Sequence, residues 1–212
     1  MKFNDLKINS AICELLKRQG IITPTAVQEK VIPQARSGKD LIIQSKTGTG
    51  KTLAFLLPTL ERTKKIPVAQ TLIIAPTREL ATQISKVAAE VCKVLELDAI
   101  LISGGKDIFA EKNKLRRSPQ IIIGTPGRIS DHLRRGTIQL SSVTTFLSIK
   151  ISCGFFINSA ASCLIRKGIV ALHKINCLSF AVSRSKFSTS SMKPSFKSSS
   201  DSPTTILLTF LS

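Results

Sequence analysis

The sequence predicts an α/β protein built on a parallel sheet with helices on both faces. Apolar runs of four or five residues alternate with longer helical patterns as far as residue 147. Continuous apolar runs are typical of strands buried on both faces, and strands separated by helices are typical of parallel sheets. Ligands of such sheets bind beyond the carboxyl ends of the strands. Polar motifs directly after an apolar run are therefore the candidates for a binding site.

Two helices are expected before the first strand. Residues 9–19 have one apolar face, with Asn9 or Ser10 as the cap and Gly20 at the end. Thr25 and Gln28 have the spacing of a capping box for a second helix through about Arg36, interrupted at Pro33. Gln28 has two interpretations. It is a helix cap, or its amide pairs with an adenine edge, since an amide both donates and accepts.

A glycine-rich loop follows the apolar run over residues 41–43 and leads into a further helix. The loop comprises Ser45, Lys46, Thr47, Gly48, Thr49, Gly50, Lys51 and Thr52. Its glycines allow close approach of the backbone to an anion, and its N–H groups point at that anion. Lys51 would reach β- and γ-phosphates, and the Thr52 hydroxyl would hold Mg²⁺. The general phosphate-loop pattern requires glycine at Ser45, so a glycine-rich turn without nucleotide is the alternative.

The later elements follow the same alternation. In chain order they are a helix over 52–65 kinked at Pro58, a strand over 71–75, a helix with an apolar stripe from Leu80 to Val94, a strand over 99–102, a basic helix over 107–117, a strand over 120–123, a helix to Arg135, and a strand over 143–147. Three of these strands run directly into polar motifs, at Pro76–Leu80, Ser103–Gly105 and Thr125–Arg128. Parallel strands end at the same edge, so these motifs and the loop are expected to share one surface.

Composition limits the class of protein. The net charge of +18 favours a polyanionic partner such as a nucleic acid. No apolar run reaches the ~18 residues of a membrane span, and the first residues lack the layout of a secretory signal. The five cysteines are odd in number and scattered, which favours free thiols over disulfides or a zinc site. We therefore expect an intracellular protein, nuclear or cytoplasmic, with no membrane contact.

Five motifs in order resemble the first RecA-like domain of a DEAD-box ATP-dependent RNA helicase. Gly20-x-x-x-Pro24-Thr25-x-x-Gln28, with Phe3 17 residues upstream of Gly20, is similar to the Q motif. Residues 45–52 are similar to motif I, in which a small residue takes the place of the first glycine. The other three are similar to motif Ia (76–80), the glycine doublet (104–105) and motif Ib (125–128). The resemblance implies a Q-motif region over 1–38 and a partial P-loop domain over 39–147.

The resemblance also implies roles for these residues. ATP, with Mg²⁺, would be held by Phe3 on the adenine, Gln28 on its edge and residues 45–52 on the phosphates, with Lys51 and Thr52 catalytic and Thr52 reaching the metal. RNA phosphates and ribose would be contacted by Pro76, Thr77, Arg78, Gly104, Gly105, Thr125, Pro126, Gly127 and Arg128. Helix N-termini and glycine turns bind phosphate without reading bases. The implied partners are RNA, bound independently of sequence, and other proteins of a ribonucleoprotein.

The match ends abruptly after residue 147. Ile149, Lys150, Ile151 and Ser152 stand where the family carries Asp-Glu-Ala-Asp, and Asp201 is the only acid after Asp131. The second RecA-like domain is also missing. Residues 148–212 include 16 serines, and their apolar stretches, such as 206–211, show no strand or helix period. This Ser-rich basic tail has three explanations: a frameshift or intron, an isoform tail that is disordered, or a new element that completes the sheet.

Three functional hypotheses remain open from the sequence. The first is an ATP-dependent RNA helicase that hydrolyses ATP. The second is a non-catalytic fragment that binds ATP and RNA without turnover, because phosphoryl transfer depends on charges that this chain lacks. The third is a truncated product that folds poorly, since a sheet with missing strands exposes apolar surface.

Overall fold

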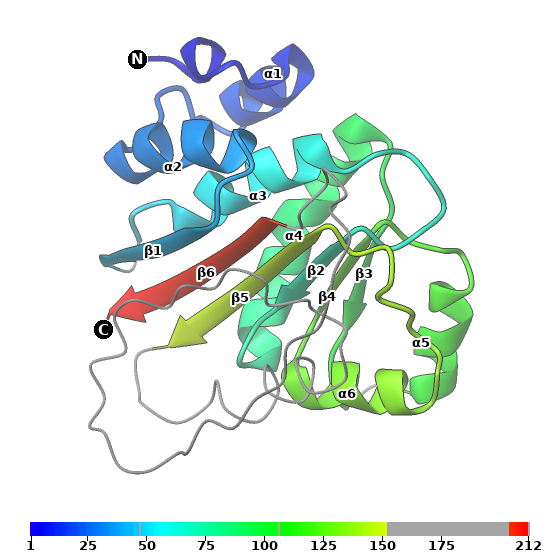
Figure 1. The fold of residues 1–212 in the computed structure, drawn as a ribbon. Helices are drawn as coiled ribbons and strands as arrows, with labels where there is room; N and C mark the ends of the chain where they lie inside the picture. The colour runs from blue at the N-terminus through cyan, green and yellow to red at the C-terminus, as the bar shows by residue number, and fades with distance from the viewer. Residues whose placement is uncertain (47, 106, 152–203, 212) are drawn as a thin grey trace, which may run out of the picture.

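The structure is a computed structural model that describes residues 1–46, 48–105, 107–151 and 204–211. Its centre is a six-stranded sheet with the order β1-β6-β5-β2-β4-β3, in which all neighbouring strands are parallel (Figure 1). The α/β fold with a parallel sheet is therefore confirmed. The four strands β5, β2, β4 and β3 lie side by side, and β1 with its glycine-rich loop lies at one edge.

The helices and strands have the following bounds: η1 Phe3–Leu6, α1 Ser10–Arg18, α2 Ala26–Arg36, β1 Leu41–Lys46, α3 Lys51–Arg62, β2 Thr71–Ile74, α4 Arg78–Leu95, β3 Ala99–Ile102, α5 Ile108–Leu115, β4 Ile121–Gly124, α6 Pro126–Arg134, β5 Thr145–Ile151 and β6 Thr204–Leu211. In this order strands alternate with helices from β1 to α6, as the apolar runs predict.

The sheet separates two apolar cores, and neighbouring residues of a strand enter opposite ones. In β2, Ile73 belongs to the larger core with α1 to α4, whereas Leu72 and Ile74 belong to the smaller core with α6. In β4, Ile122 likewise faces the smaller core between neighbours that face the larger one. Side chains of a strand alternate between faces, so an apolar run fills both cores at once. Helices accordingly cover both faces (Figure 1).

The amino-terminal elements follow local capping signals. Asn9 caps α1 by accepting from the Ala11 N–H at 2.9 Å, and Gly20 follows the helix with a φ of +76°. Thr25 and Gln28 form the predicted capping box at the start of α2. α2 ends at Arg36 as predicted, but the expected interruption at Pro33 is wrong, because the helix is continuous through this residue. Pro33 lies in the last turn, where its missing N–H removes a single helix bond.

The strands at the glycine-rich end are longer than predicted. β1 continues to Lys46 instead of ending at residue 43, and β5 continues to Ile151 instead of ending at residue 147. The stretch 206–211, expected to lack a strand period, lies in β6, which pairs with both β1 and β5. This placement favours the third explanation of the tail, an element that completes the sheet. The rest of the tail, 152–203 and Ser212, lies outside the described residues.

Among the described residues, the helices are too short or too polar to cross a membrane.

Candidate functional site

The glycine-rich loop connects the carboxyl end of β1 to the start of α3. Gly48 and Gly50 have φ values of +77° and +80°, which L side chains rarely adopt. Gly50 is also the N-cap of α3, and a Cβ there would lie 2.6 Å from Gln28 Nε2. Both glycines are therefore required by backbone geometry, and the loop presents the N-terminus of a helix, which suits an anion. Thr47 lies outside the described residues.

Gln28 joins the start of α2 to this loop. Its Oε1 accepts from the Thr25 N–H at 2.9 Å, and its Nε2 donates to Gly50 O at 3.0 Å. Thr25 Oγ1 also donates to Thr49 O at 2.9 Å. The capping interpretation of Gln28 is confirmed, and the same side chain also fixes the loop. Adenine recognition by Gln28 stays a prediction.

Lys51, the first residue of α3, folds back over the loop. Its Nζ donates to Ser45 O at 2.7 Å and also to Lys46 O, and the residue is 3% exposed. Burial lowers the pKa of the Lys51 ammonium. Thr52 is half-buried beside it, and the Ser45 and Thr49 hydroxyls lie 2.7 Å apart. The loop thus concentrates N–H and O–H donors and one cation where a phosphate chain would lie.

Phe3 lies in η1 near the same end of the molecule as α2. It is buried in the larger core, with 3% of its surface exposed. One side of it lines a cavity of about 330 Å³ together with Cys13, Ile21 and Ile22. A largely apolar cavity of this size can take an aromatic ring, so the predicted contact with adenine remains open to test.

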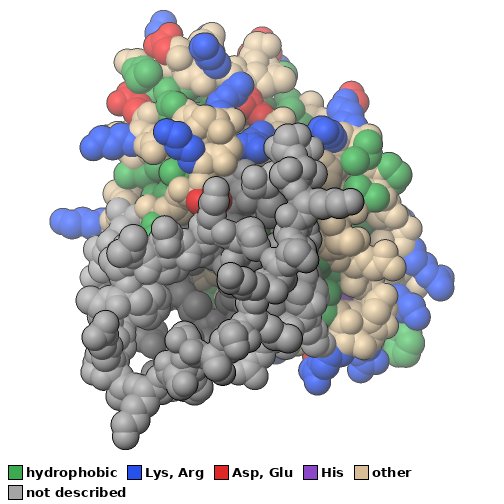
Figure 2. All heavy atoms as spheres, viewed as in Figure 1, with side chains coloured by type: hydrophobic (Ala, Val, Ile, Leu, Met, Phe, Trp, Pro, Cys, Tyr) green, Lys and Arg blue, Asp and Glu red, His purple; other side chains and the backbone are tan. Residues whose placement is uncertain are grey.

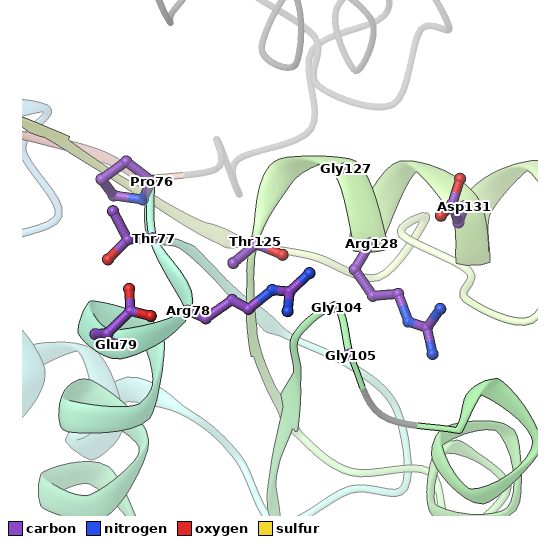
Figure 3. Close-up of a pocket in the computed structure, with 10 residues that line it drawn as sticks. All are labelled: Pro76, Thr77, Arg78, Glu79, Gly104, Gly105, Thr125, Gly127, Arg128 and Asp131. Atoms are coloured by element: carbon purple, nitrogen blue, oxygen red, sulfur yellow. The ribbon is translucent and has the colours of Figure 1, made fainter.

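A second, larger pocket of about 720 Å³ lies at the ends of β2, β3 and β4 (Figure 3). Its lining brings together eight of the nine residues predicted to bind RNA, the exception being Pro126, which begins α6. The lining residues are Pro76, Thr77, Arg78, Glu79, Gly104, Gly105, Thr125, Gly127, Arg128 and Asp131. Three separate segments of the chain contribute, so the pocket confirms that these motifs share one surface.

The Arg78 guanidinium packs directly against the glycine doublet, Gly104 and Gly105. A Cβ on Gly104 would lie 2.9 Å from Arg78 Nη2, and one on Gly105 would lie 2.7 Å from Nη1. Gly105 also has a φ of +90°. In Figure 3 the Arg78 side chain reaches beneath Thr125 toward this turn. The guanidinium of Arg78 can therefore lie here only because neither residue of the doublet has a Cβ.

Arg128, unlike Arg78, is fixed by an ion pair with a carboxylate of another helix. Its Nε donates to Glu111 Oε2 at 2.7 Å, and its side chain is only 14% exposed. Glu111 belongs to α5 and was not expected to contribute to the site. His132 of α6 is fully buried and donates from Nε2 to the same oxygen at 2.9 Å. A carboxylate only accepts, which fixes the direction of both bonds.

Two acidic residues of the pocket were missed by sequence reasoning. Asp131 pairs with Arg134 on its own helix, α6. At the start of α4, hydrogen bonds from the Glu79 backbone and the Thr77 side chain, with the Arg78 charge, lower the pKa of Glu79. Thr77 is the N-cap of α4 and accepts from the Leu80 N–H at 3.2 Å. Glu79 is exposed and Asp131 is half-buried, and from the sequence alone neither can be told apart from an acidic residue on a solvated helix face.

The donor set fits a nucleotide better than it fits a catalytic Mg²⁺ site. Magnesium in nucleotide sites is held by carboxylates in addition to phosphate oxygens. Ile149 is buried in the larger core at a position where the family carries a carboxylate, and its side chain has no oxygen. Within the described residues there is also no group of three or more His, Cys, Asp or Glu that could hold a metal. Thr52 is the one residue of this chain that is predicted to bind the Mg²⁺ ion.

Comparison with known proteins agrees with this arrangement. The family profile described as DEAD/DEAH box helicase matches residues 25–147. The chain is 42% identical over 147 residues to the ATP-dependent RNA helicase CshA of Listeria monocytogenes, covering 69% of this chain and 28% of that protein. It is 40% identical over 144 residues to the DEAD-box ATP-dependent RNA helicase CshA of Bacillus subtilis, covering 68% and 29%. This chain therefore spans less than a third of the length of these relatives.

Solved structures show the same fold. A DEAD box protein from Methanococcus jannaschii superposes with a TM-score of 0.62 at 31% identity, covering 80% of this chain and 44% of that one. A hypothetical ATP-dependent RNA helicase from Sulfolobus tokodaii superposes with a TM-score of 0.67 at 24% identity, covering 95% and 50%. With a family profile that spans more than half of its residues, this chain belongs to the DEAD/DEAH box helicase family.

Proposed function

We propose that this chain binds ATP at the loop 45–52 and an RNA backbone at the large pocket, without turning ATP over. The observation that carries the proposal is the convergence of eight predicted RNA-contacting residues on one pocket. The pocket and the ATP loop both lie at the carboxyl edge of one parallel sheet. The chain would act as one half-site of a helicase.

The nucleotide would be bound mainly through its phosphates. The glycines of the loop, the N-terminus of α3 and the Lys51 ammonium supply donors and positive charge. Lys51 would exchange its bonds to Ser45 O and Lys46 O for phosphate oxygens. The phosphates would then stabilise the charged ammonium, which burial alone disfavours.

The RNA would be bound through its backbone. The N-termini of α4 and α6 meet at the pocket, and Arg78 lies between them and the glycine turn. Helix N-termini and arginine suit phosphate oxygens, which carry no sequence information. The chain has no Trp and no Tyr to stack on bases.

Turnover is not expected because the charges that assist phosphoryl transfer are absent from the sequence. Ile149, Lys150, Ile151 and Ser152 stand where the family carries the carboxylates that assist phosphoryl transfer. A helicase that hydrolyses ATP is the second candidate, and family membership is what favours it.

The test is a set of binding measurements on the full 212-residue chain. Lys51→Ala should weaken ATP binding by about tenfold to a hundredfold, as the loss of a hydrogen-bonded charge predicts. Arg78→Ala should weaken single-stranded RNA binding and reduce its salt dependence by about 0.7 in the logarithmic slope, the value of one phosphate contact. In the presence of RNA, the unaltered chain should hydrolyse ATP no faster than the Lys51→Ala variant does.

Lys93→Ala is the matched control for Arg78→Ala. Lys93 is an exposed cation in the last turn of the same helix, α4, about 22 Å from Arg78 at 1.5 Å per residue. Equal losses of RNA affinity in both variants would show that net charge, and not the pocket, binds RNA. ATP turnover above background would instead favour the hydrolysing helicase.

A further inference from the structure

One carboxylate, Glu111, connects α5 to the residue after β3 and to α6, directly behind residues that line the large pocket. It lies on α5, a helix whose other charges are basic, and its side chain is 4% exposed. Its Oε1 accepts from the Ser103 N–H at 3.2 Å, and its Oε2 accepts from Arg128 and His132. Glutamates are rarely buried unless they are paired, and these three hydrogen bonds are what allows Glu111 to be buried here.

The partners of Glu111 fix its carboxylate in one orientation. Ser103 follows β3 directly and is buried just before Gly104 and Gly105, which line the pocket, so its N–H anchors Glu111 behind the glycine turn. His132 stands on the same face of α6 as Arg128, four residues on, and its ring is held from the other side by Thr137 Oγ1 at 2.7 Å. Both oxygens of Glu111 are therefore used.

The fixed carboxylate in turn sets the position of Arg128. A free arginine side chain has many rotamers, and ordering it on binding a ligand costs free energy. The hydrogen bond of 2.7 Å from Arg128 Nε to Glu111 holds the arginine side chain in one conformation before a ligand binds. In Figure 3 Arg128 points away from Arg78, toward the side of the pocket where α5 begins. Arg78 and Arg128 thus stand apart along the pocket, as two phosphates of one strand would.

We propose that Glu111 is a positioning residue for RNA binding, acting through Arg128. The proposal rests on the proposed binding of RNA at this pocket. Glu111 touches no ligand itself. It holds the Arg128 guanidinium where a phosphate of the RNA backbone passes, and the Ser103 and His132 bonds keep its own carboxylate in place. If the Glu111–Arg128 ion pair served only the fold, the loss of Glu111 would lower stability, and its effect on RNA affinity would not depend on whether Arg128 is present.

The decisive measurement is a double-variant cycle on RNA affinity in the full chain. Gln at position 111 keeps the shape but has one acceptor oxygen, so it cannot serve both Ser103 and the Arg128–His132 pair. Glu111→Gln and Arg128→Ala should each weaken single-stranded RNA binding by about tenfold. The double variant should be no more than about twofold weaker than Arg128→Ala, because Glu111 has nothing left to position.

Thr137→Val is the matched control. It removes the hydroxyl that holds His132 from the far side but leaves Glu111 and Arg128 paired. We expect lower stability in urea with RNA affinity within about twofold of wild type. A large loss of RNA affinity in Thr137→Val would assign the effect to general loosening of the network and overturn the proposal.

A measurement on the wild-type chain guards against misfolding of the variants. With ¹⁵N-labelled arginine, the Arg128 Nε–H should exchange with solvent at least about tenfold more slowly than that of Arg135, which is exposed. Equal exchange rates would overturn the proposal. RNA binding with additive losses in the cycle would overturn it too, whereas no RNA binding by wild type would overturn the proposed function and this inference together.

Discussion

Single residues decide the shape of the large pocket, and the glycine doublet is the sharpest case. Gly105 combines a left-handed backbone with a guanidinium nitrogen 2.7 Å from where its Cβ would be. The two constraints are independent, since φ belongs to the turn and the close approach belongs to Arg78. A change at this position therefore affects both the turn and the arginine.

Gly105→Ala is expected to destabilise the chain and to weaken RNA binding about as much as Arg78→Ala does. The left-handed backbone alone costs a residue with a Cβ about 1–2 kcal/mol. Gly136→Ala is the control, because Gly136 also has a left-handed backbone, with a φ of +66°, but a Cβ there meets nothing within 4 Å and the residue does not line the pocket. Urea unfolding and RNA titration of the two variants test this, and only Gly105→Ala should lose RNA affinity. An equal loss of RNA affinity in both variants would contradict the role assigned to the turn.

The sequence predicts residues whose role is local and misses those whose role depends on distant partners. Gly48, Gly50 and the Thr25–Gln28 box are visible because their spacing alone demands a conformation. Glu111 was missed because its partners lie in other elements, and a lone glutamate on a basic helix looks like part of a solvated face. His132 was missed for the same reason.

At the scale of elements, the alternation of apolar runs and helices was enough for β1 to β5 and α1 to α6. Local patterns failed where packing overrides them. Proline was expected to break α2, but tertiary contacts retain its last turn, and Arg62 Nη1 donates to the Ala35 carbonyl at 3.1 Å. β6 was missed because its partners, β1 and β5, are far away in the sequence, and strand pairing of that kind leaves no local signal.

The last turn of α4 gives the fold a specific dependence on pH. Burial, with a smaller contribution from Asp98, raises the pKa of the Cys92 thiol to about 12. The unfolded thiol ionises near its ordinary value of 9.0, so between these values the folded chain holds one more proton. Stability should therefore fall as the pH rises from about 9 to 12, by up to about 1.4 kcal/mol per unit.

Cys92→Ala isolates this effect from the titration of other groups. The variant should be less stable than wild type at pH 8, because a buried side chain is shortened, but its stability should fall less steeply above pH 9. Urea midpoints measured at several pH values for both chains provide the test. Parallel curves for the two would show that Cys92 is not the group responsible.

The whole molecule depends on whether the sheet is continuous between the two candidate sites. β1 carries the ATP loop, and β2, β3 and β4 carry the pocket. β6 joins these parts, since it pairs with β1 along Leu41–Lys46 and with β5 along Thr145–Ile151 (Figure 1). Figure 2 shows Lys and Arg side chains around the margins of one face, in keeping with the net charge of +18.

Leu208→Pro tests whether β6 closes the sheet. Leu208 lies opposite Ile43 of β1 and Ile149 of β5, and a proline there removes a ladder bond and clashes with its neighbours. We expect a loss of at least about 3 kcal/mol in urea unfolding and faster hydrogen exchange in β1 and β5. Thr204→Pro is the control, because proline is tolerated at the first residue of a strand. If Leu208→Pro unfolded at the same urea concentration as wild type, β6 would not belong to the sheet in solution, and β1 and β5 would have to be held together by other parts of the chain.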